Sequence, residues 1–415
     1  MRELLTFEQA PPFSVPLRFL LTAIPFAMAA GLLLALSGDA LATRWSRESL
    51  AITHLMTAGF MLQAMCGALM QLTPVAIGAN LPRPRLLAWL VHPPMTIGGI
   101  CLAAGLFLHS APMLTAGGLA VALSALLLAA AALTSLARTP ARNHSRQAMR
   151  IALVGLVFTV ILGLALALAR AGFELPATIL SVAAHLRVGW LLWGLTLLCA
   201  ASFMVVPMFQ MTPAYPEHFQ RWFPPLLALA VVAAASGIAA PLGDILVCAL
   251  AAGYAGLTLR LQQRRRRPRT DASFAFWRIA LASTMLAAAL APALGWMADP
   301  TRAEVLLGAL VLLGGFDSVI CAMIYKIVPF LVWLHLSRAG APPLLMHQVI
   351  PESTMRLHLR IHAAALLFSL PAPWWPPCAA AAGLLLFAGH SVQAVGLAGG
   401  LRRYLRHRGM EQGAA

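Results

Sequence analysis

Long apolar runs follow one another along almost the whole chain, and they constrain its fold more than any other feature. A helix that crosses a bilayer needs roughly 20 apolar residues, and short polar joints separate stretches of about that length. These runs are continuous and rich in Leu and Ala, whereas the strands of a membrane β-barrel alternate apolar and polar residues. The sequence therefore predicts an all-α integral membrane protein whose partner is the lipid bilayer.

We expect about 12 transmembrane helices in one polytopic domain that covers residues 1–415. Apolar residues make up 60% of the sequence and charged residues 10%, which leaves no stretch suited to a separate soluble core. The predicted spans cover residues 15–36, 49–75, 86–108, 113–136, 151–171, 178–209, 224–240, 244–261, 274–297, 304–333, 357–370 and 377–404.

The basic residues predict the orientation of these spans. The formal net charge is +16, but the arginines lie in short joints, which argues against a nucleic-acid partner. Strongly basic joints follow even-numbered spans, for example Arg83 and Arg85 after the second span and Arg264 to Arg266 after the eighth. By the positive-inside rule both the N and C termini are cytoplasmic. We expect a multi-pass protein of a bacterial-type inner (cytoplasmic) membrane.

The second, sixth and tenth spans share a pattern. Each is unusually long, contains glycines, and carries a proline near its predicted cytoplasmic end: Pro74, Pro207 and Pro329. Four spans separate each of these helices from the next. The pattern predicts three units of four helices, which gives a pseudo-threefold array.

Three of the 12 histidines lie well inside predicted spans: His54, His185 and His390. An ionisable residue inside the hydrocarbon is costly and indicates a functional site. At 1.5 Å per residue, His54 and His185 lie roughly 9 Å and roughly 11 Å from the same membrane edge, and His390 lies roughly 20 Å deep. Two imidazoles at one depth suit the axial ligation of a haem. The alternative is that the two histidines are unrelated and bond to neighbouring carbonyls.

The other histidines fall at predicted membrane edges or in joints, where structural roles are the simpler interpretation. His358 and His362 belong to this group. All six cysteines lie in apolar runs without a CxxC pair, which favours buried core positions over a disulfide or a metal site. Arg187 suits either a haem propionate or an acidic partner such as Asp317.

The segment from Thr53 to Gly78, THLMTAGFMLQAMCGALMQLTPVAIG, resembles the second helix of the haem–copper oxidase subunit I superfamily. That helix carries a haem-ligating histidine near its outer end and a glycine and a proline near its inner end. The superfamily has twelve helices, termini inside and a pseudo-threefold array, as expected here. The chain is also similar in size and span count to the NnrS family, described as haem- and copper-containing membrane proteins.

The sequence departs from the oxidases at their copper ligands. The seventh span has no histidine, whereas the oxidases carry a pair there. The tenth span has no histidine before His335 at its cytoplasmic end, whereas the oxidases carry a His-x-His motif on that helix. The resemblance therefore implies a protein that binds haem b without a complete copper site. Its cofactor-binding residues would be His54, His185, Arg187 and His390, with His54 and His185 as ligands of the metal. Copper is a less favoured second metal.

Several functions follow from this interpretation. The resemblance implies a role in handling nitric oxide or another diatomic gas, or in electron transfer from a quinol or a small redox partner. A second subunit is an additional expected partner. If the protein is an enzyme, it is a haem-dependent oxidoreductase. One alternative is a secondary transporter with a coupling site at Asp317, Arg187 and His185. Another is a copper-handling protein that uses His54, Met56, His185 and Met208.

Overall fold

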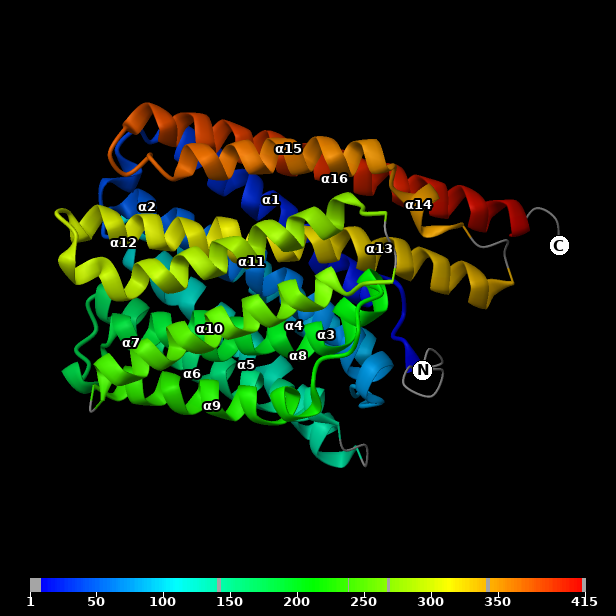
Figure 1. The fold of residues 1–415 in the computed structure, drawn as a ribbon, viewed down its shortest axis with the longest axis horizontal. Coiled ribbons are helices and arrows are strands. Elements are labelled where there is room, and N and C mark those ends of the chain that lie inside the picture. The colour runs from blue at the N-terminus through cyan, green and yellow to red at the C-terminus, as the bar shows by residue number, and fades with distance from the viewer. Residues whose placement is uncertain (1–8, 140–142, 238, 267–268, 341–343, 413–415) are drawn as a thin grey trace. The chain divides into compact units, whose positions relative to one another are not determined.

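The computed structural model describes residues 9–139, 143–237, 239–266, 269–340 and 344–412. Within these residues the secondary structure is helical and contains no strand. Ten helices in the described part of the chain are long and apolar enough to cross a membrane. The predicted all-α membrane class is therefore confirmed, and the protein has the helices of a multi-pass membrane protein (Figure 1). Residues 1–8 and 413–415 are outside the described residues, so the cytoplasmic location of the termini stays a prediction.

The helices group into two compact units, each of which draws on separate stretches of the chain. The first unit consists of Met1–Pro11, Leu69–Pro268 and Thr284–Pro300, and the second unit of Pro12–Ala68, Arg269–Ser283 and Thr301–Ala415. The helices that begin at Leu62, Ala272 and Pro300 contribute to both units. Because the units alternate along the chain, neither forms from one continuous segment.

The first unit contains long antiparallel helices joined by short connections. Its helices are α4 (Pro84–Leu108), α5 (Ala111–Arg138), α6 (His144–Arg170), α7 (Val182–Arg187), α8 (Thr196–Gln210), α9 (Glu217–Ser236) and α10 (Ala240–Gln263). It also includes the end of α3 (Leu62–Ile77) and the short turns η5 (Ala177–Ile179) and η7 (Ala291–Trp296). Helix α5 packs on α4 and α6, and α9 packs on α10. The side chains of Asn143 and Ser181 cap α6 and α7 by accepting backbone N–H groups.

The second unit contains the helices that build the candidate site. They are α1 (Ser14–Leu36), α2 (Arg47–His54), α12 (Pro300–Ala309), α13 (Ser318–Ala339), α14 (Met346–Val349), α15 (Glu352–Ser369) and α16 (Pro376–Gln412), with the first part of α11 (Ala272–Leu290) and the turn η3 (Ala40–Ala42). Helix α16 packs along α1 and α15 (Figure 1). The α1–α16 contact is close because Gly31 and Gly383 face the backbone of the opposite helix. Small residues allow this approach between membrane helices.

Three π-helical segments occur in the three long helices that share the proline pattern. They are η4 (Leu55–Met61), η6 (Val188–Leu195) and η8 (Leu310–Asp317). Each begins nineteen residues before its proline, at Pro74, Pro207 and Pro329. A π-helical turn is rare and often marks a functional site. The repeated position supports the predicted relationship among these three helices.

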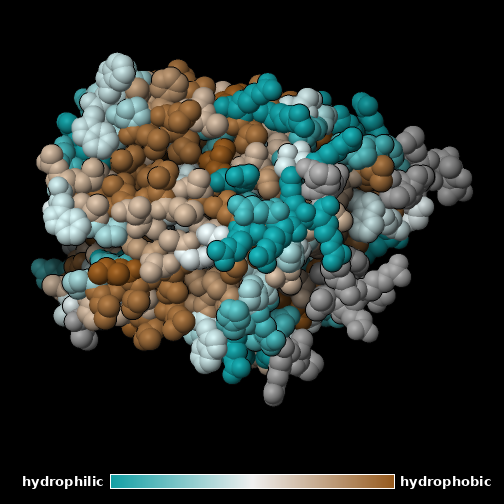
Figure 2. Space-filling view, in the orientation of Figure 1, coloured by the Kyte–Doolittle hydropathy of each residue, from teal (hydrophilic) through white to brown (hydrophobic). Residues whose placement is uncertain are grey.

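Helices α9 and α15 correspond to the seventh and eleventh predicted spans but are not among the ten candidate membrane helices in the described residues. Each carries charged residues along its first half, such as Arg221 in α9 and Arg356 in α15. The total of about 12 spans therefore stays a prediction. Apolar side chains cover much of the face shown in Figure 2, as expected of helices that contact lipid.

Candidate metal centre

A cluster of polar side chains is buried among four helical elements of the second unit. We call it the buried cluster. Its members are Asp317 at the end of η8, Cys321 on α13, His358 and His362 on α15, and His390 and Gln393 on α16. Each of the six is at most 1% exposed. Polar side chains this deeply buried need partners, because transfer from water without them costs several kcal/mol (roughly 2–7 per group).

Helical periodicity aligns these residues. Asp317, which directly precedes α13, is four residues from Cys321, and His358 and His362 are four residues apart on α15, so each pair lies on one helix face. His390 and Gln393 are three residues apart on α16, which also places them on one face. Three polar pairs thus meet at one place.

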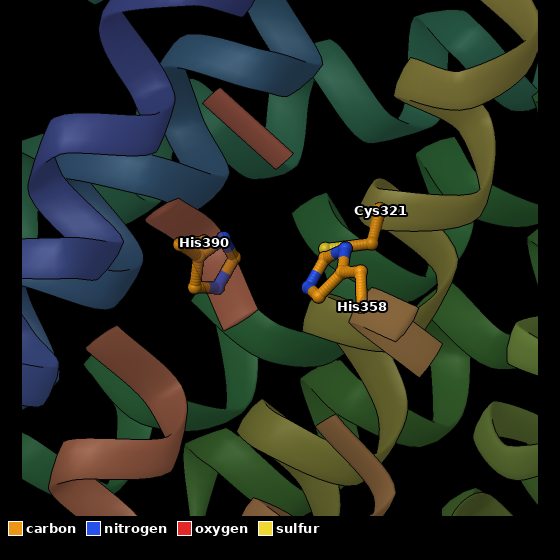
Figure 3. Close-up of side chains that lie close together, drawn as sticks. All are labelled: Cys321, His358 and His390. Carbon is orange, nitrogen blue, oxygen red and sulfur yellow. The ribbon is translucent and has the colours of Figure 1, made fainter. Parts of the chain in front are cut away.

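Three members of the cluster form a group that can hold a metal ion. The ligand atoms of Cys321, His358 and His390 all lie within 4.8 Å of one another. Figure 3 shows the Cys321 sulfur beside the His358 ring, with the His390 ring opposite them on a different helix. Thiolate sulfur and imidazole nitrogen bind zinc and copper. The structure therefore contains a buried site whose donor atoms suit a transition metal.

Asp317 is the one carboxylate in the cluster. Its Oδ1 atom accepts a hydrogen bond from the Cys321 thiol at 3.2 Å and lies 3.4 Å from Nε2 of His390. Its Oδ2 atom lies 3.6 Å from Nδ1 of His362 and has no hydrogen-bond partner. The ion-pair partners of Asp317 are thus two histidines, which carry charge only when protonated. A buried carboxylate is stable only when a nearby positive charge compensates it.

Gln393 sets the orientation of the His390 ring. The Nδ1 atom of His390 lies 3.1 Å from the side-chain oxygen of Gln393, so Nδ1 donates its hydrogen to that oxygen. The other ring nitrogen, Nε2, lies 3.4 Å from Oδ1 of Asp317 and has no hydrogen-bond partner. Nε2 carries a hydrogen when the ring is protonated and a lone pair when the ring is neutral. The neutral ring can therefore offer Nε2 to a metal ion.

His358 has a hydrogen-bond partner of its own. The hydroxyl group of Tyr325 lies 2.9 Å from its Nδ1 atom, and Tyr325 is 2% exposed. The ring of Phe276, on α11, packs against both His358 and His362 at centroid distances of 5.1 and 5.2 Å. A histidine that binds a metal through one ring nitrogen typically forms a hydrogen bond to another protein group through its other ring nitrogen. The contact with Tyr325 gives His358 this arrangement.

His54 and His185, predicted as ligands of one metal, are not part of this group, and they belong to different units. His54 ends α2, and its Nδ1 atom lies 2.8 Å from the carbonyl oxygen of Leu50. His185 is on α7, and its Nδ1 atom lies 3.1 Å from the carbonyl oxygen of Thr159. Their role in cofactor binding stays a prediction.

Arg187, the third predicted cofactor-binding residue, forms an ion pair with an acid that the sequence did not suggest. Its Nε and Nη2 atoms donate to the two carboxylate oxygens of Asp244 at 2.8 and 2.7 Å. Asp317 lies in the other unit and pairs with histidines, so it is not the partner of Arg187 that we considered. The Arg187 guanidinium group, for which a haem propionate was one predicted partner, thus forms a bidentate ion pair with Asp244 in this structure.

His390 is the one predicted cofactor-binding residue that the structure places in the buried cluster, and Asp317, considered for a transporter coupling site, lies there as well. The sequence interpretation missed His358 and His362, because it began the eleventh span at Leu357 and so placed both at a membrane edge. Helix α15 begins five residues earlier, at Glu352, and both histidines are 1% exposed. The spacing of four residues between them was a signal that could have identified a shared buried face.

Cys321 is the second residue that sequence reasoning missed. The predicted burial is confirmed for Cys66, Cys199, Cys321 and Cys378, and the structure leaves all six cysteines free. Cys321 departs from the prediction in one respect, because it lies in a group that can hold a metal ion. Burial alone does not distinguish Cys321 from the other cysteines. Its position one helical turn after Asp317 does distinguish it.

No protein-family model matches the chain, and no curated protein matches it significantly.

Proposed function

We propose that this protein holds a copper ion at Cys321, His358 and His390 as a resident redox centre within a membrane. The convergence of one sulfur and two imidazole donors within 4.8 Å carries this proposal. Two histidines and one cysteine are the ligands of many electron-transfer copper sites. Copper bound there would supply one-electron chemistry, and a quinol or a small redox protein would be its partner.

The surrounding residues fit this role. Asp317 supplies a negative charge beside the ligands, and the unpaired Nε2 atom of His390 faces it. Gln393 and Tyr325 hold the other nitrogens of His390 and His358. Such outer partners orient ligating histidines and raise metal affinity.

A bare ion fits this cluster better than a haem. A haem iron already has equatorial nitrogen ligands and takes at most two axial ligands from the protein. Here three donor atoms from three helices converge, and aromatic rings pack close to the histidines. The Phe60 ring lies 5.2 Å from the His390 ring. The three ligand side chains are at most 1% exposed, and this burial favours a permanently bound ion over an ion that is transported through the protein.

Metal analysis of the purified protein tests the proposal. We expect copper in stoichiometric amount in the wild type and a loss of at least about tenfold in Cys321→Ser and in His390→Ala, because each removes a ligand. Cys66→Ser is the matched control, since Cys66 is a buried cysteine of the same unit outside the cluster. A wild-type protein that binds no metal, or that binds only zinc, would contradict the copper centre.

Haem b bound at His54 is the second candidate. The nitrogen Nδ1 of His54 donates to the Leu50 carbonyl, so Nε2 carries the lone pair that a haem iron would accept. The π-helical segment η4 begins at the next residue, Leu55. A reduced-minus-oxidised absorption spectrum tests this: a haem band in the wild type that disappears in His54→Ala supports it. Loss of the band in His185→Ala as well would identify His185 as the second ligand.

The topology proposed for this function is an array of about 12 spans in a bacterial-type inner membrane, with both termini in the cytoplasm. The basic joints support this orientation. The repeated position of η4, η6 and η8 supports three related units. Reporter fusions at Ser110 and at Arg264 test the orientation, because we expect Ser110 on the outer side and Arg264 on the cytoplasmic side.

A further inference from the structure

Two exposed arginines of the second unit lie on membrane helices without a partner. They are Arg278 on α11 and Arg360 on α15. Neither forms a hydrogen bond or an ion pair with another residue in the described part of the chain. An uncompensated charge on a membrane helix is costly and indicates a functional site.

The two arginines lie at a similar depth. Helices α11 and α15 begin next to each other, because the backbone N–H of Ala272 donates to the Glu352 carboxylate at 2.9 Å. At 1.5 Å per residue, Arg278 lies about 9 Å and Arg360 about 12 Å along its helix from that end. Both guanidinium groups therefore belong to the same layer of the protein.

Helix α16 relates this depth to the membrane. Helix α15 packs along α16, which is long and apolar enough to span a bilayer. Gly389 of α16 lies beside the His358 ring, so Arg360 is close to the level of Gly389. That glycine lies about 20 Å along α16 from Pro376. In a hydrocarbon core about 30 Å thick, Arg360 then lies about 10 Å inside the opposite edge.

The exposed face of α15 is apolar around Arg360. Leu357 is 49% exposed, Leu367 is 67% exposed and Phe368 is 44% exposed, as expected of side chains that contact acyl chains. Helical side chains tilt toward the N-terminus of their helix, so the long Arg360 side chain extends toward the edge at which α15 begins. Its guanidinium group reaches the level of the lipid headgroups there.

The acids at this edge already have partners. The Glu352 carboxylate accepts a hydrogen bond from Nε of Arg356 at 2.9 Å, and Asp271 forms an ion pair with Lys326. The two unpartnered arginines therefore leave two positive charges that no described acid compensates. A guanidinium group binds a phosphate through two parallel hydrogen bonds, which makes phosphate a suitable partner.

We propose that Arg278 and Arg360 bind the headgroup phosphate of an anionic phospholipid, whose acyl chains lie against Leu357 and Phe368. Basic sites between membrane helices bind anionic headgroups. A zwitterionic lipid fits less well, because its own ammonium group already balances its phosphate. The bound lipid links the outer faces of α11 and α15, the helices whose inner faces meet at the buried cluster. This proposal does not depend on the metal.

Lipid binding to the intact protein tests the proposal. The delipidated protein in detergent is titrated with phosphatidylglycerol or with phosphatidylcholine of the same acyl chains, and bound lipid is counted by native mass spectrometry. We expect phosphatidylglycerol to bind more tightly. Arg278→Gln and Arg360→Gln should each weaken its binding about fivefold, and the double variant about 25-fold. Arg170→Gln is the control, because Arg170 is an exposed arginine at the end of α6 in the first unit.

Three results would overturn the proposal. The first is equal phosphatidylglycerol affinity in the wild type and the double variant. The second is equally tight binding of phosphatidylcholine to the wild type. The third is displacement of phosphatidylglycerol by an equal concentration of inorganic phosphate, which would identify a site for a free anion. If the double variant does not fold, the two single variants decide, and wild-type affinity in both would also overturn it.

Discussion

The Oδ1 atom of Asp317 lies 3.4 Å from the Nε2 atom of His390, although the whole of α15 separates these two residues in the chain. Asp317 is the last residue of the π-helical segment η8, and His390 lies near the middle of α16. Their contact brings the carboxylate to the edge of the three-ligand group. The centre therefore has its negative charge beside its ligands and within a fully buried environment.

The charge of Asp317 is expected to control metal affinity. In Asp317→Asn the side chain keeps its shape but loses the negative charge that faces His390 and His362. We expect copper affinity to fall at least about tenfold, as for other outer partners of metal ligands. Competition titration measures the change, and Asp39→Asn, on an exposed loop, is the control. Unchanged affinity in Asp317→Asn would show that the carboxylate does not compensate a bound cation.

Tyr325 is expected to act as a positioning residue for His358. Tyr325→Phe removes the hydroxyl that lies 2.9 Å from Nδ1 of His358 and keeps the ring. We expect copper affinity to fall about 10–100-fold and the copper absorption bands to shift, while the amount of folded protein stays the same. Tyr404→Phe is the control, because Tyr404 stacks on Phe13 away from the cluster. An identical spectrum in Tyr325→Phe would rule out this role.

The space beside His358 depends on a glycine of α16. A Cβ atom at Gly389 would lie 3.1 Å from Cδ2 and 3.4 Å from Nε2 of the His358 ring. Gly389→Ala should therefore displace the ring slightly and weaken copper binding several-fold, without a loss of thermal stability. The control is Gly399→Ala on the same helix, where the one nearby atom is Nη1 of Arg403 at 4.0 Å. Equal copper affinities in the two variants would show that the ring position is not critical.

The close packing of α1 on α16 is expected to be important for stability. A Cβ atom at Gly383 would lie 2.4 Å from the backbone nitrogen of Ala35, and neither backbone can move without separating the helices. We expect Gly383→Ala to cost about 1–3 kcal/mol and to lower the midpoint of thermal unfolding in detergent. Gly399→Ala again provides the comparison. A midpoint equal to that of the wild type would mean that the helices separate without cost.

The sequence was sufficient to predict the membrane class and most of the helices, because an apolar run long enough to span a bilayer is a local property. The proline pattern at Pro74, Pro207 and Pro329 also identified the three helices that contain π-helical segments. His390 was recognised for a similar local reason, since an ionisable residue in the middle of an apolar run is conspicuous.

The cluster itself was decided by tertiary structure. In the sequence, Cys321 is not distinguished from the other cysteines in apolar runs, and the polar residues that precede His358 and His362 place these histidines at a predicted membrane edge. Only the packing of α15 and α16 in the second unit brings these side chains to Asp317. Hydrophobicity and helical periodicity determine which face of each helix is buried, but they do not determine which buried faces meet. That choice depends on side-chain packing between helices distant in the chain, such as the contact between Gly389 and His358.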